Sequence, residues 1–432
     1  MSKVIWNVGR CALAWVAVLV MSSTPAFAAK KAKAAAPKAE EPPRVLQIEI
    51  SHQLPPSRVK ALQDIVERFN AESPAYQVTL VESGWGGDKL PHLLILDGAD
   101  EEAFLASKKP RYKPLFALMK EAGVGLQTVR APAMVTRRPI NAKGQLLALP
   151  VGLSTPVLYF NRAALKRAKL DPFATSAFAT WGELQGVLSK LSASGSRCPL
   201  ALAEPARVLI ENVSAWNNVP VLKGKQAVFN GLFHVKYLAL MASWYRANLL
   251  HVYQDRAEAE KRFAGGECAM LVGPSDSWVD FRQAGLDVGV THLPYQDDAP
   301  GAPQNTLADG AALWAAAGKK AAEYKGVARF VSFWLQPDNQ VAWQREAGYL
   351  PLNRAGIMAS ESSLLGEELE NIKVAISELS GRPTTINSAV QAVIERDSTR
   401  RIIDEELAEI WADRKAAKAA LDSAVARISS GK

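Results

Sequence analysis

The residue types that most often perform catalysis are scattered along this sequence, without the spacing that their chemistry requires. No Gly-x-Ser-x-Gly elbow presents a nucleophilic serine, and no glycine loop followed by Lys and Ser or Thr could hold a nucleotide phosphate. The histidines lack the His-x-x-x-His spacing of a metal site and stand at His52, His92, His234, His251 and His292. The sequence therefore favours a binding protein over an enzyme and predicts neither a metal nor a cofactor.

A run of acids, Asp404-Glu405-Glu406, comes nearest to a pair of catalytic carboxylates. A glycoside hydrolase places its two carboxylates on either side of the scissile bond, and no second acid is placed here to share that work. The apolar neighbours Ile403 and Leu407 indicate instead that the acids form the solvated face of a helix.

Polar and aromatic residues follow the predicted strands of the N-terminal part. Trp85 lies in the glycine-rich loop 84–87, Asp97 follows the apolar stretch 92–96, and Ser154 precedes a further strand. In open α/β sheets, ligands bind beyond the carboxyl ends of the strands. We therefore expect Trp85, Asp97 and Ser154 at the ligand-binding edge.

Two serines follow the stretch 263–273, which predicts a turn and then a strand. Ser275 and Ser277 could offer hydroxyl and backbone N–H groups to an anion. Serine is also a favoured cap at a helix start, so the capping role stays open for both residues.

The apolar pattern predicts an α/β fold. Apolar residues alternate with polar ones in 46–50 and 77–80, and recur at helical spacing over 59–69. The apolar run 157–160, after Pro150-Val-Gly152, predicts a buried strand where the chain enters a second compact unit. Since the chain passes between two α/β units more than once, we expect two lobes joined by several strands, which is a hinge.

Helices are expected in both units. Helical patterns cover 163–168, 325–335 and 399–428, and Thr180 with Glu183 forms a Thr-x-x-Glu capping box.

Composition limits the class of partner. The 432 residues are 48% hydrophobic and 22% charged, with a formal net charge of +8, as in a soluble globular protein. The basic residues form no aromatic-studded stripe, so no nucleic acid partner is expected. A small anionic molecule fits the mild positive charge better.

The N-terminus has the layout of a secretory signal peptide. Lys3 and Arg10 precede an apolar run, 11–21, and Ala26-Phe-Ala28 is a cleavage site. The run is too short for a membrane span. We expect residues 1–28 to be removed near Ala28 on export to the periplasm, and the Lys- and Ala-rich stretch 29–43 to be a disordered tether.

The exported chain keeps Cys198 and Cys268. An oxidising compartment permits a disulfide between them, and two buried free thiols are the alternative.

Several stretches, taken in order, resemble one family. They are Arg68-Phe-Asn-Ala-Glu-Ser-Pro74, Ser154-Thr-Pro-Val-Leu-Tyr159, Glu211-Asn-Val-Ser-Ala-Trp-Asn217, Gly266-Glu-Cys-Ala-Met270, Ala302-Pro-Gln-Asn305, Gly348-Tyr-Leu-Pro351 and Ile403-Asp-Glu-Glu-Leu407. The set resembles the periplasmic glycerol-3-phosphate-binding proteins of ABC importers, within sugar-binding family 1 of the extracellular solute-binding proteins. The resemblance covers nearly all of residues 45–430.

The resemblance implies a type II periplasmic-binding-protein fold, in which each lobe is an open sheet flanked by helices. It places 44–152 and 294–346 in the N-terminal lobe, and 153–293 and 347–432 in the C-terminal lobe.

The resemblance also implies ligand contacts at Ser154, Gly310, Tyr349 and Arg400. Arg400 would offer its guanidinium to phosphate oxygens, and Gly310 would let a backbone N–H approach the ligand closely. Replacement of Arg400 by Ala is then predicted to weaken binding by about tenfold or more.

The sequence departs from the family at the positions that, in the family, contact the polyol end of the ligand. A family tyrosine falls on Trp85 or Gly86, and a glutamate falls on Gly98, beside Asp97. A serine becomes Pro274, beside Ser275. Two family tryptophans fall on Glu204 and Arg207. The anion-holding positions are thus largely kept, which predicts a phosphate-bearing or otherwise anionic ligand that need not be glycerol 3-phosphate.

The function that the resemblance implies is capture of an organic phosphate by hinge closure. A monomeric binding protein would deliver it to the transmembrane permease subunits of an importer with a cytoplasmic ATPase. Three alternatives stay open: a receptor for a neutral sugar or oligosaccharide, an exported glycerophosphodiester or glycan hydrolase, and a receptor that serves a sensor kinase.

Overall fold

The computed structural model describes residues 45–87, 89–126, 140–141, 143–389 and 396–430. The predicted signal peptide and tether lie outside these residues and stay predictions. Across the described chain, no helix combines the length and the apolar character that crossing a membrane requires.

The first sheet has the strand order β2-β1-β3-β12-β4. Its strands are β1 (Leu46–His52), β2 (Tyr76–Leu80), β3 (Leu93–Leu96), β4 (Leu149–Pro150) and β12 (Ala312–Ala315). The first three run parallel, while β12 lies antiparallel between β3 and β4. Ile48 and Ile50 are buried and Gln47 is exposed, which confirms the predicted alternation.

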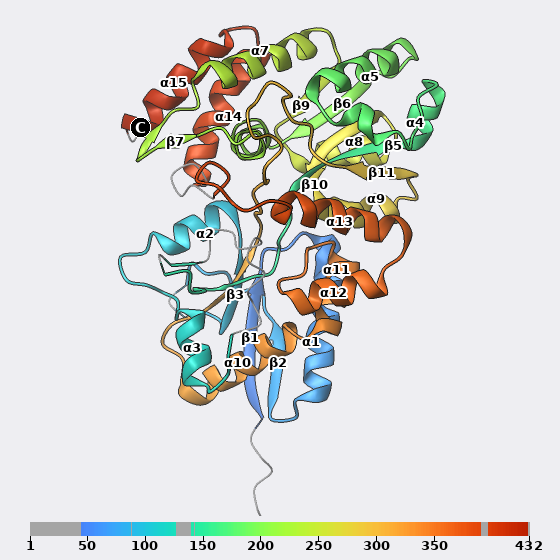
Figure 1. The fold of residues 1–432 in the computed structure, drawn as a ribbon. Helices are drawn as coiled ribbons and strands as arrows, with labels where there is room; N and C mark the ends of the chain where they lie inside the picture. The colour runs from blue at the N-terminus through green and yellow to red at the C-terminus, as the bar shows by residue number, and fades with distance from the viewer. Residues whose placement is uncertain (1–44, 88, 127–139, 142, 390–395, 431–432) are drawn as a thin grey trace, which may run out of the picture. The chain divides into compact units, whose positions relative to one another are not determined.

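Helices cover the first sheet (Figure 1). They are α1 (Pro56–Glu72), α2 (Gly98–Leu105), α3 (Leu115–Glu121), α10 (Ala321–Trp334), α11 (Pro337–Ala347) and α12 (Arg354–Ser363). Phe69 of α1 meets Phe330 and Phe333 of α10 edge to face, with ring centroids 5.1 and 5.5 Å apart. The predicted helix 325–335 is therefore confirmed as part of α10, and its apolar face lies in the core.

The second sheet has the order β11-β5-β10-β6-β9. Its strands are β5 (Pro156–Asn161), β6 (Cys198–Ala203), β9 (Leu250–Tyr253), β10 (Cys268–Pro274) and β11 (Val288–Thr291). Strands β6, β9 and β10 run parallel, and β5 is antiparallel to β10 and β11. All six residues of β5 are buried, as the continuous apolar run predicted. The expected α/β class with two sheets is confirmed.

Helices also surround the second sheet. They are α4 (Arg162–Arg167), α5 (Trp181–Ala193), α6 (Val213–Trp216), α7 (Leu232–Arg246), α8 (Arg256–Ala264), α9 (Trp278–Gln283), α13 (Gly366–Ser380), α14 (Asp397–Trp411) and α15 (Ala417–Ser430). Two short 3-10 helices, η2 (Thr175–Phe178) and η4 (Ser275–Ser277), and a π-helix, η3 (Ala206–Asn212), also belong to this part of the chain. The strands β7 (Leu222–Lys223) and β8 (Gln226–Ala227) form a separate antiparallel hairpin. The capping box of Thr180 and Glu183 is present at the start of α5. The helical tail expected over 399–428 is two helices, because Asp413 between them has a left-handed backbone, with φ of 56°.

The chain passes from one sheet to the other through extended segments. Residues 151–155 lead from β4 to β5, and 292–311 lead from β11 back to β12. Ser154 and Asp309 join the two segments by a pair of backbone hydrogen bonds, each 3.0 Å long. The predicted lobe boundaries stay predictions, although α12 contacts α11 of the first sheet and lies after the boundary expected at 347.

Side chains also connect the two sets of elements. Arg58 on α1 donates to both carboxylate oxygens of Asp280 on α9, at 2.9 and 2.6 Å, and to the backbone oxygen of Asp276 at 2.9 Å. At the start of α14, Ser398 donates its backbone N–H and its hydroxyl to Glu102 of α2, at 3.1 and 2.8 Å. Elements of the two sheets are thus bound to each other both at α1 and at α2.

A disulfide pairs Cys198 with Cys268. The two residues are neighbours in register on the parallel strands β6 and β10, and both are buried. Of the two alternatives left open by the sequence, the structure therefore contains the disulfide.

Candidate functional site

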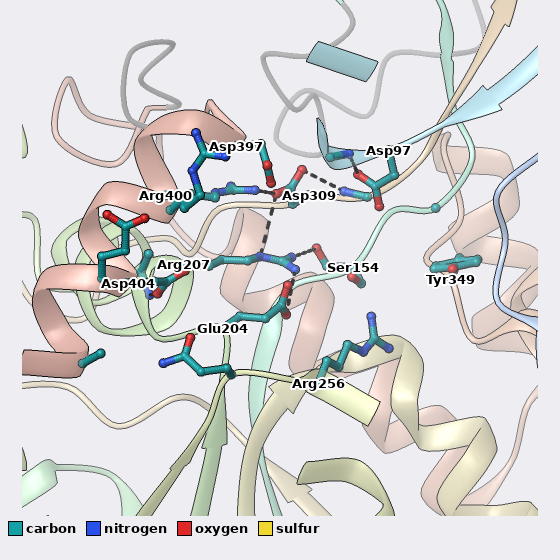
Figure 2. Close-up of a pocket in the computed structure, with 18 residues that line it drawn as sticks. Asp97, Ser154, Glu204, Arg207, Arg256, Asp309, Tyr349, Asp397, Arg400 and Asp404 are labelled. Atoms are coloured by element: carbon teal, nitrogen blue, oxygen red, sulfur yellow. Dashed lines mark hydrogen bonds and ion pairs between the residues drawn. The ribbon is translucent and has the colours of Figure 1, made fainter. Parts of the chain in front are cut away.

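A cavity of about 580 Å³ lies where the crossing segments meet the strand ends of both sheets (Figure 2). Asp97 follows β3 of the first sheet, Glu204 follows β6 of the second, and Gln254 follows β9. The start of α14 forms a further wall. The position agrees with the rule that ligands bind beyond the carboxyl ends of parallel strands.

The cavity wall is strongly charged. Among the residues that the structure describes, its cations are Arg207, Arg256, Arg400 and Arg401, and its acids are Asp97, Glu204, Asp309, Asp397, Asp404 and Glu405. Within the same part of the chain, no three His, Cys, Asp or Glu side chains gather closely enough to hold a metal ion. The charged side chains of the wall can form ion pairs and hydrogen bonds with a polar, charged molecule.

Five of the seven residues that the sequence predicts as ligand contacts line this cavity together. They are Asp97, Ser154, Gly310, Tyr349 and Arg400. They come from β3, both crossing segments, the end of α11 and α14, so residues up to 303 positions apart in the chain meet in one place.

Trp85 and Ser275 do not line the cavity. The Trp85 ring meets Phe104 edge to face, with centroids 6.2 Å apart, and is half-buried. Ser275 is fully buried, and its hydroxyl accepts a hydrogen bond from the backbone N–H of Thr155 at 3.3 Å. Ligand contact by these two residues stays a prediction.

Arg400 is held by carboxylates rather than left open to the cavity. Its Nε and Nη2 donate to the two oxygens of Glu211 at 2.6 and 2.8 Å, and its Nη1 lies 2.5 Å from Asp309 Oδ2. Glu211 is buried, so this bidentate pair is shielded from water. The positive charge of Arg400 is thus balanced within the protein.

Tyr349 lines the cavity, and its ring is closely packed. The ring stacks on Trp343 with centroids 5.7 Å apart, and the guanidinium of Arg58 lies 6.0 Å from its centre. Burial raises the pKa of the Tyr349 hydroxyl above its ordinary value. The group therefore stays protonated and can donate a hydrogen bond.

Gly310 is required by a close approach of the two crossing segments. Its φ is +136°, and a Cβ at this position would lie 1.7 Å from the backbone oxygen of Gly152. Its own N–H donates to Asp309 Oδ1 at 2.9 Å. The glycine thus positions Asp309, in addition to the backbone role that the sequence suggested.

Replacement of Gly310 by Ala is expected to lower the free energy of unfolding by about 2–3 kcal/mol, because the added Cβ forces the two backbones apart. Denaturant unfolding of the purified protein measures the change. The control is Gly318→Ala, whose φ of +78° is also positive but which has no atom within 4 Å of the added Cβ. A loss no larger than that of the control would contradict the steric explanation.

Glu204, Arg207, Arg256 and Asp309 line the cavity, and the sequence reasoning did not select them as ligand contacts. A signal was present for three of them. Glu204 and Arg207 follow β6 and Arg256 follows β9, at the edge where Asp97 follows β3. The strand-end rule, applied to the second sheet as it was to the first, would have found them.

Asp404 accepts a hydrogen bond at the start of the π-helix η3, which carries Arg207. Its Oδ1 accepts a hydrogen bond from the backbone N–H of Ala206 at 2.8 Å. Burial, with the negative charges of Glu211 and Glu204, raises the pKa of Asp404 to about 7. The carboxyl group is therefore protonated in part of the molecules at neutral pH.

The raised pKa makes stability depend on pH. The stabilising effect of protonated Asp404 is fully present below the unfolded value near 4 and is lost as pH rises through about 7. We expect Asp404→Asn, which keeps the acceptor oxygen, to remove a slope of roughly 1 kcal/mol per pH unit between pH 5 and 7. Denaturant unfolding of both proteins at several pH values measures this, and parallel curves would contradict it.

Comparison with known proteins assigns the family. Residues 106–358 match the model of the family described as bacterial extracellular solute-binding protein. The sn-glycerol-3-phosphate-binding periplasmic protein UgpB of Pectobacterium atrosepticum is 31% identical over 390 residues, which cover 85% of this chain and 87% of that protein. UgpB of Yersinia pestis is 30% identical over 405 residues, covering 89% and 91%.

Solved structures share the fold. UgpB from Mycobacterium tuberculosis in complex with glycerophosphocholine superposes with a TM-score of 0.72 at 19% identity, covering 89% of this chain and 98% of that one. Maltose-bound MalE3 of T. maritima gives 0.70 at 17% identity, covering 90% and 100%. The expected type II fold, two open sheets flanked by helices, is thereby confirmed. The chain belongs to the family of bacterial extracellular solute-binding proteins.

Proposed function

We propose that this protein is the periplasmic substrate-binding component of an ABC importer, and that it captures glycerol 3-phosphate or a related organic phosphate such as a glycerophosphodiester. The observation that carries the proposal is the cavity with charged walls, where Asp97, Ser154, Gly310, Tyr349 and Arg400 meet. The relatives named for glycerol 3-phosphate, with which this chain aligns over most of its length, support it.

The origin of the wall residues supports capture by closure. Asp97 comes from the first sheet, while Glu204 and Arg256 follow strands of the second. A ligand stabilises the closed form only if it binds that form better, which contacts on both sides provide. The closed protein would then deliver the ligand to permease subunits served by a cytoplasmic ATPase. We propose that the protein acts as a monomer and leaves the cytoplasm after cleavage near Ala28.

The charge of the cavity wall restricts the class of ligand that we expect to bind. Carboxylates outnumber arginines in the wall, so a doubly charged anion meets more repulsion than a singly charged one. A phosphomonoester carries close to two negative charges at neutral pH, because its second pKa is about 6. A phosphodiester carries one, and a cationic group on the same molecule would pair with the carboxylates. The excess of carboxylates in the wall therefore favours a phosphodiester over a phosphomonoester among the organic phosphates proposed as ligands.

Calorimetric titration tests the proposal directly. Purified protein is titrated with glycerol 3-phosphate, glycerophosphocholine and maltose at one fixed ionic strength, because charge contacts weaken with salt. We expect binding of the phosphates and none of maltose. Binding of maltose alone would replace the proposal with a neutral-sugar receptor. Release of glycerol 3-phosphate from glycerophosphocholine during incubation would replace it with a hydrolase.

A further inference from the structure

The arginines of the cavity differ in how well the protein already satisfies them. Arg400 has both oxygens of Glu211 and one of Asp309 within 2.8 Å. Arg256 has Glu260 Oε1 and Asp276 Oδ2 each at 2.6 Å. Both guanidinium groups therefore make short, charge-assisted hydrogen bonds inside the protein.

Arg207 makes only long contacts. Its Nη1 lies 3.5 Å from Glu204 Oε2, its Nη2 lies 3.5 Å from the backbone oxygen of Ser154, and its Nε lies 4.0 Å from Asp309 Oδ2. N–H···O hydrogen bonds are usually 2.7–3.2 Å long. Among the described residues, Arg207 Nε has no hydrogen-bond partner, although only 8% of the side chain is exposed.

A buried guanidinium with weak partners is costly, since it has lost its water without gaining full pairing. Figure 2 shows Arg207 reaching from η3 toward Ser154, with Glu204 and Asp309 on either side. Glu204, two residues before η3, is strained as well, because it has a left-handed backbone with φ of 52°. The structure thus holds a poorly paired cation in place beside an acid, inside the cavity.

We infer that Arg207 is the residue that binds the anionic group of the ligand and so determines specificity for charge. This inference rests on the proposed function. The planar fork of Arg207 can donate two parallel hydrogen bonds to two oxygens of a phosphate or carboxylate. Glu204 lies beside the same fork, and its negative charge opposes an incoming anion. Arg400 and Arg256, whose charges are already balanced, hold the wall in place around Arg207.

Replacing Arg207 and replacing Glu204 are expected to change the affinity for the ligand in opposite directions. A merely structural role of the two residues would not produce this pattern. Removing the cation in Arg207→Gln should weaken the binding of glycerol 3-phosphate by about 10- to 100-fold, as expected for loss of a charged hydrogen bond. Removing the acid in Glu204→Gln should strengthen it several-fold. Arg207→Lys keeps the charge and loses the fork, so it should fall between Arg207→Gln and the wild type.

Calorimetry on the full-length processed protein provides the test, with Arg246→Gln as the matched control. Arg246 lies on α7 outside the cavity, with 58% of its side chain exposed, so its variant should bind as the wild type does. Thermal unfolding checks that each variant is folded. If Arg207→Gln is unfolded, the affinities of Arg207→Lys and Glu204→Gln decide whether Arg207 binds the anionic group.

Two failures are distinguishable. If the wild type binds glycerol 3-phosphate or glycerophosphocholine, and a folded Arg207→Gln binds it equally well, this inference is wrong while the proposed function stands. Unchanged or weaker binding by Glu204→Gln would also count against the inference. If the wild type binds neither phosphate, the proposed function fails and the inference fails with it.

Discussion

Replacement of Arg58 by Met is expected to lower the free energy of unfolding by about 3–5 kcal/mol. Arg58 makes three hydrogen bonds of 2.6–2.9 Å, two to the carboxylate of Asp280 and one to the backbone oxygen of Asp276. Only 2% of the Arg58 side chain and 2% of the Asp276 side chain are exposed, and 32% of the Asp280 side chain is exposed. Methionine fills much of the space but leaves these acceptors without their donor, and water cannot fully replace it.

The same helix supplies a control for the Arg58 prediction. Lys60 also pairs with an acid, Asp64, at 2.6 Å, but 81% of its side chain is exposed. Lys60→Met should therefore leave the free energy of unfolding almost unchanged. Denaturant unfolding of both variants measures the difference. Equal losses would show that burial of the Arg58 pair does not matter. A double-mutant cycle with Asp280→Asn isolates the pair itself.

Removal of the disulfide should lower the free energy of unfolding by an amount similar to that expected for the Arg58 variant. Cys198 and Cys268 are 70 positions apart, and a crosslink that closes a loop of this length restricts the unfolded chain strongly. We expect Cys198→Ala combined with Cys268→Ala to lower the free energy of unfolding by about 4 kcal/mol, and the temperature of unfolding with it.

Reductant provides the control for this prediction. It should destabilise the wild type by a comparable amount and leave the double variant unchanged, since the variant has no bond to reduce. An alkylation assay on the native wild type should find neither thiol reactive. Destabilisation of the double variant by reductant, or two reactive thiols in the wild type, would contradict the assignment.

Much of the fold could be predicted because local patterns report burial. The alternation in 46–50 and the unbroken apolar run of β5 specify strands with one and two covered faces. The capping box at Thr180 marked the start of α5. Such features depend on neighbours in the chain. The break between α14 and α15 was missed because one residue, Asp413, carries the turn without glycine or proline.

The site was harder, because its charges are set by partners far away in the chain. Arg400 pairs with Glu211, 189 positions earlier, and this pairing decides whether its charge is available to a ligand. The resemblance identified Ser154, Gly310 and Tyr349 as wall residues through family patterns. It could not supply a role for Arg207, because the family has a different residue type there.

The contact between α2 and α14 gives a way to watch the protein move. The Ser398 backbone N–H belongs to the first turn of α14, where no partner exists within the helix, and Glu102 of α2 accepts its hydrogen bond. Any separation of the two helices exposes that amide to water. Its exchange with deuterium should therefore slow when a ligand holds the helices together, which would report closure in unlabelled protein.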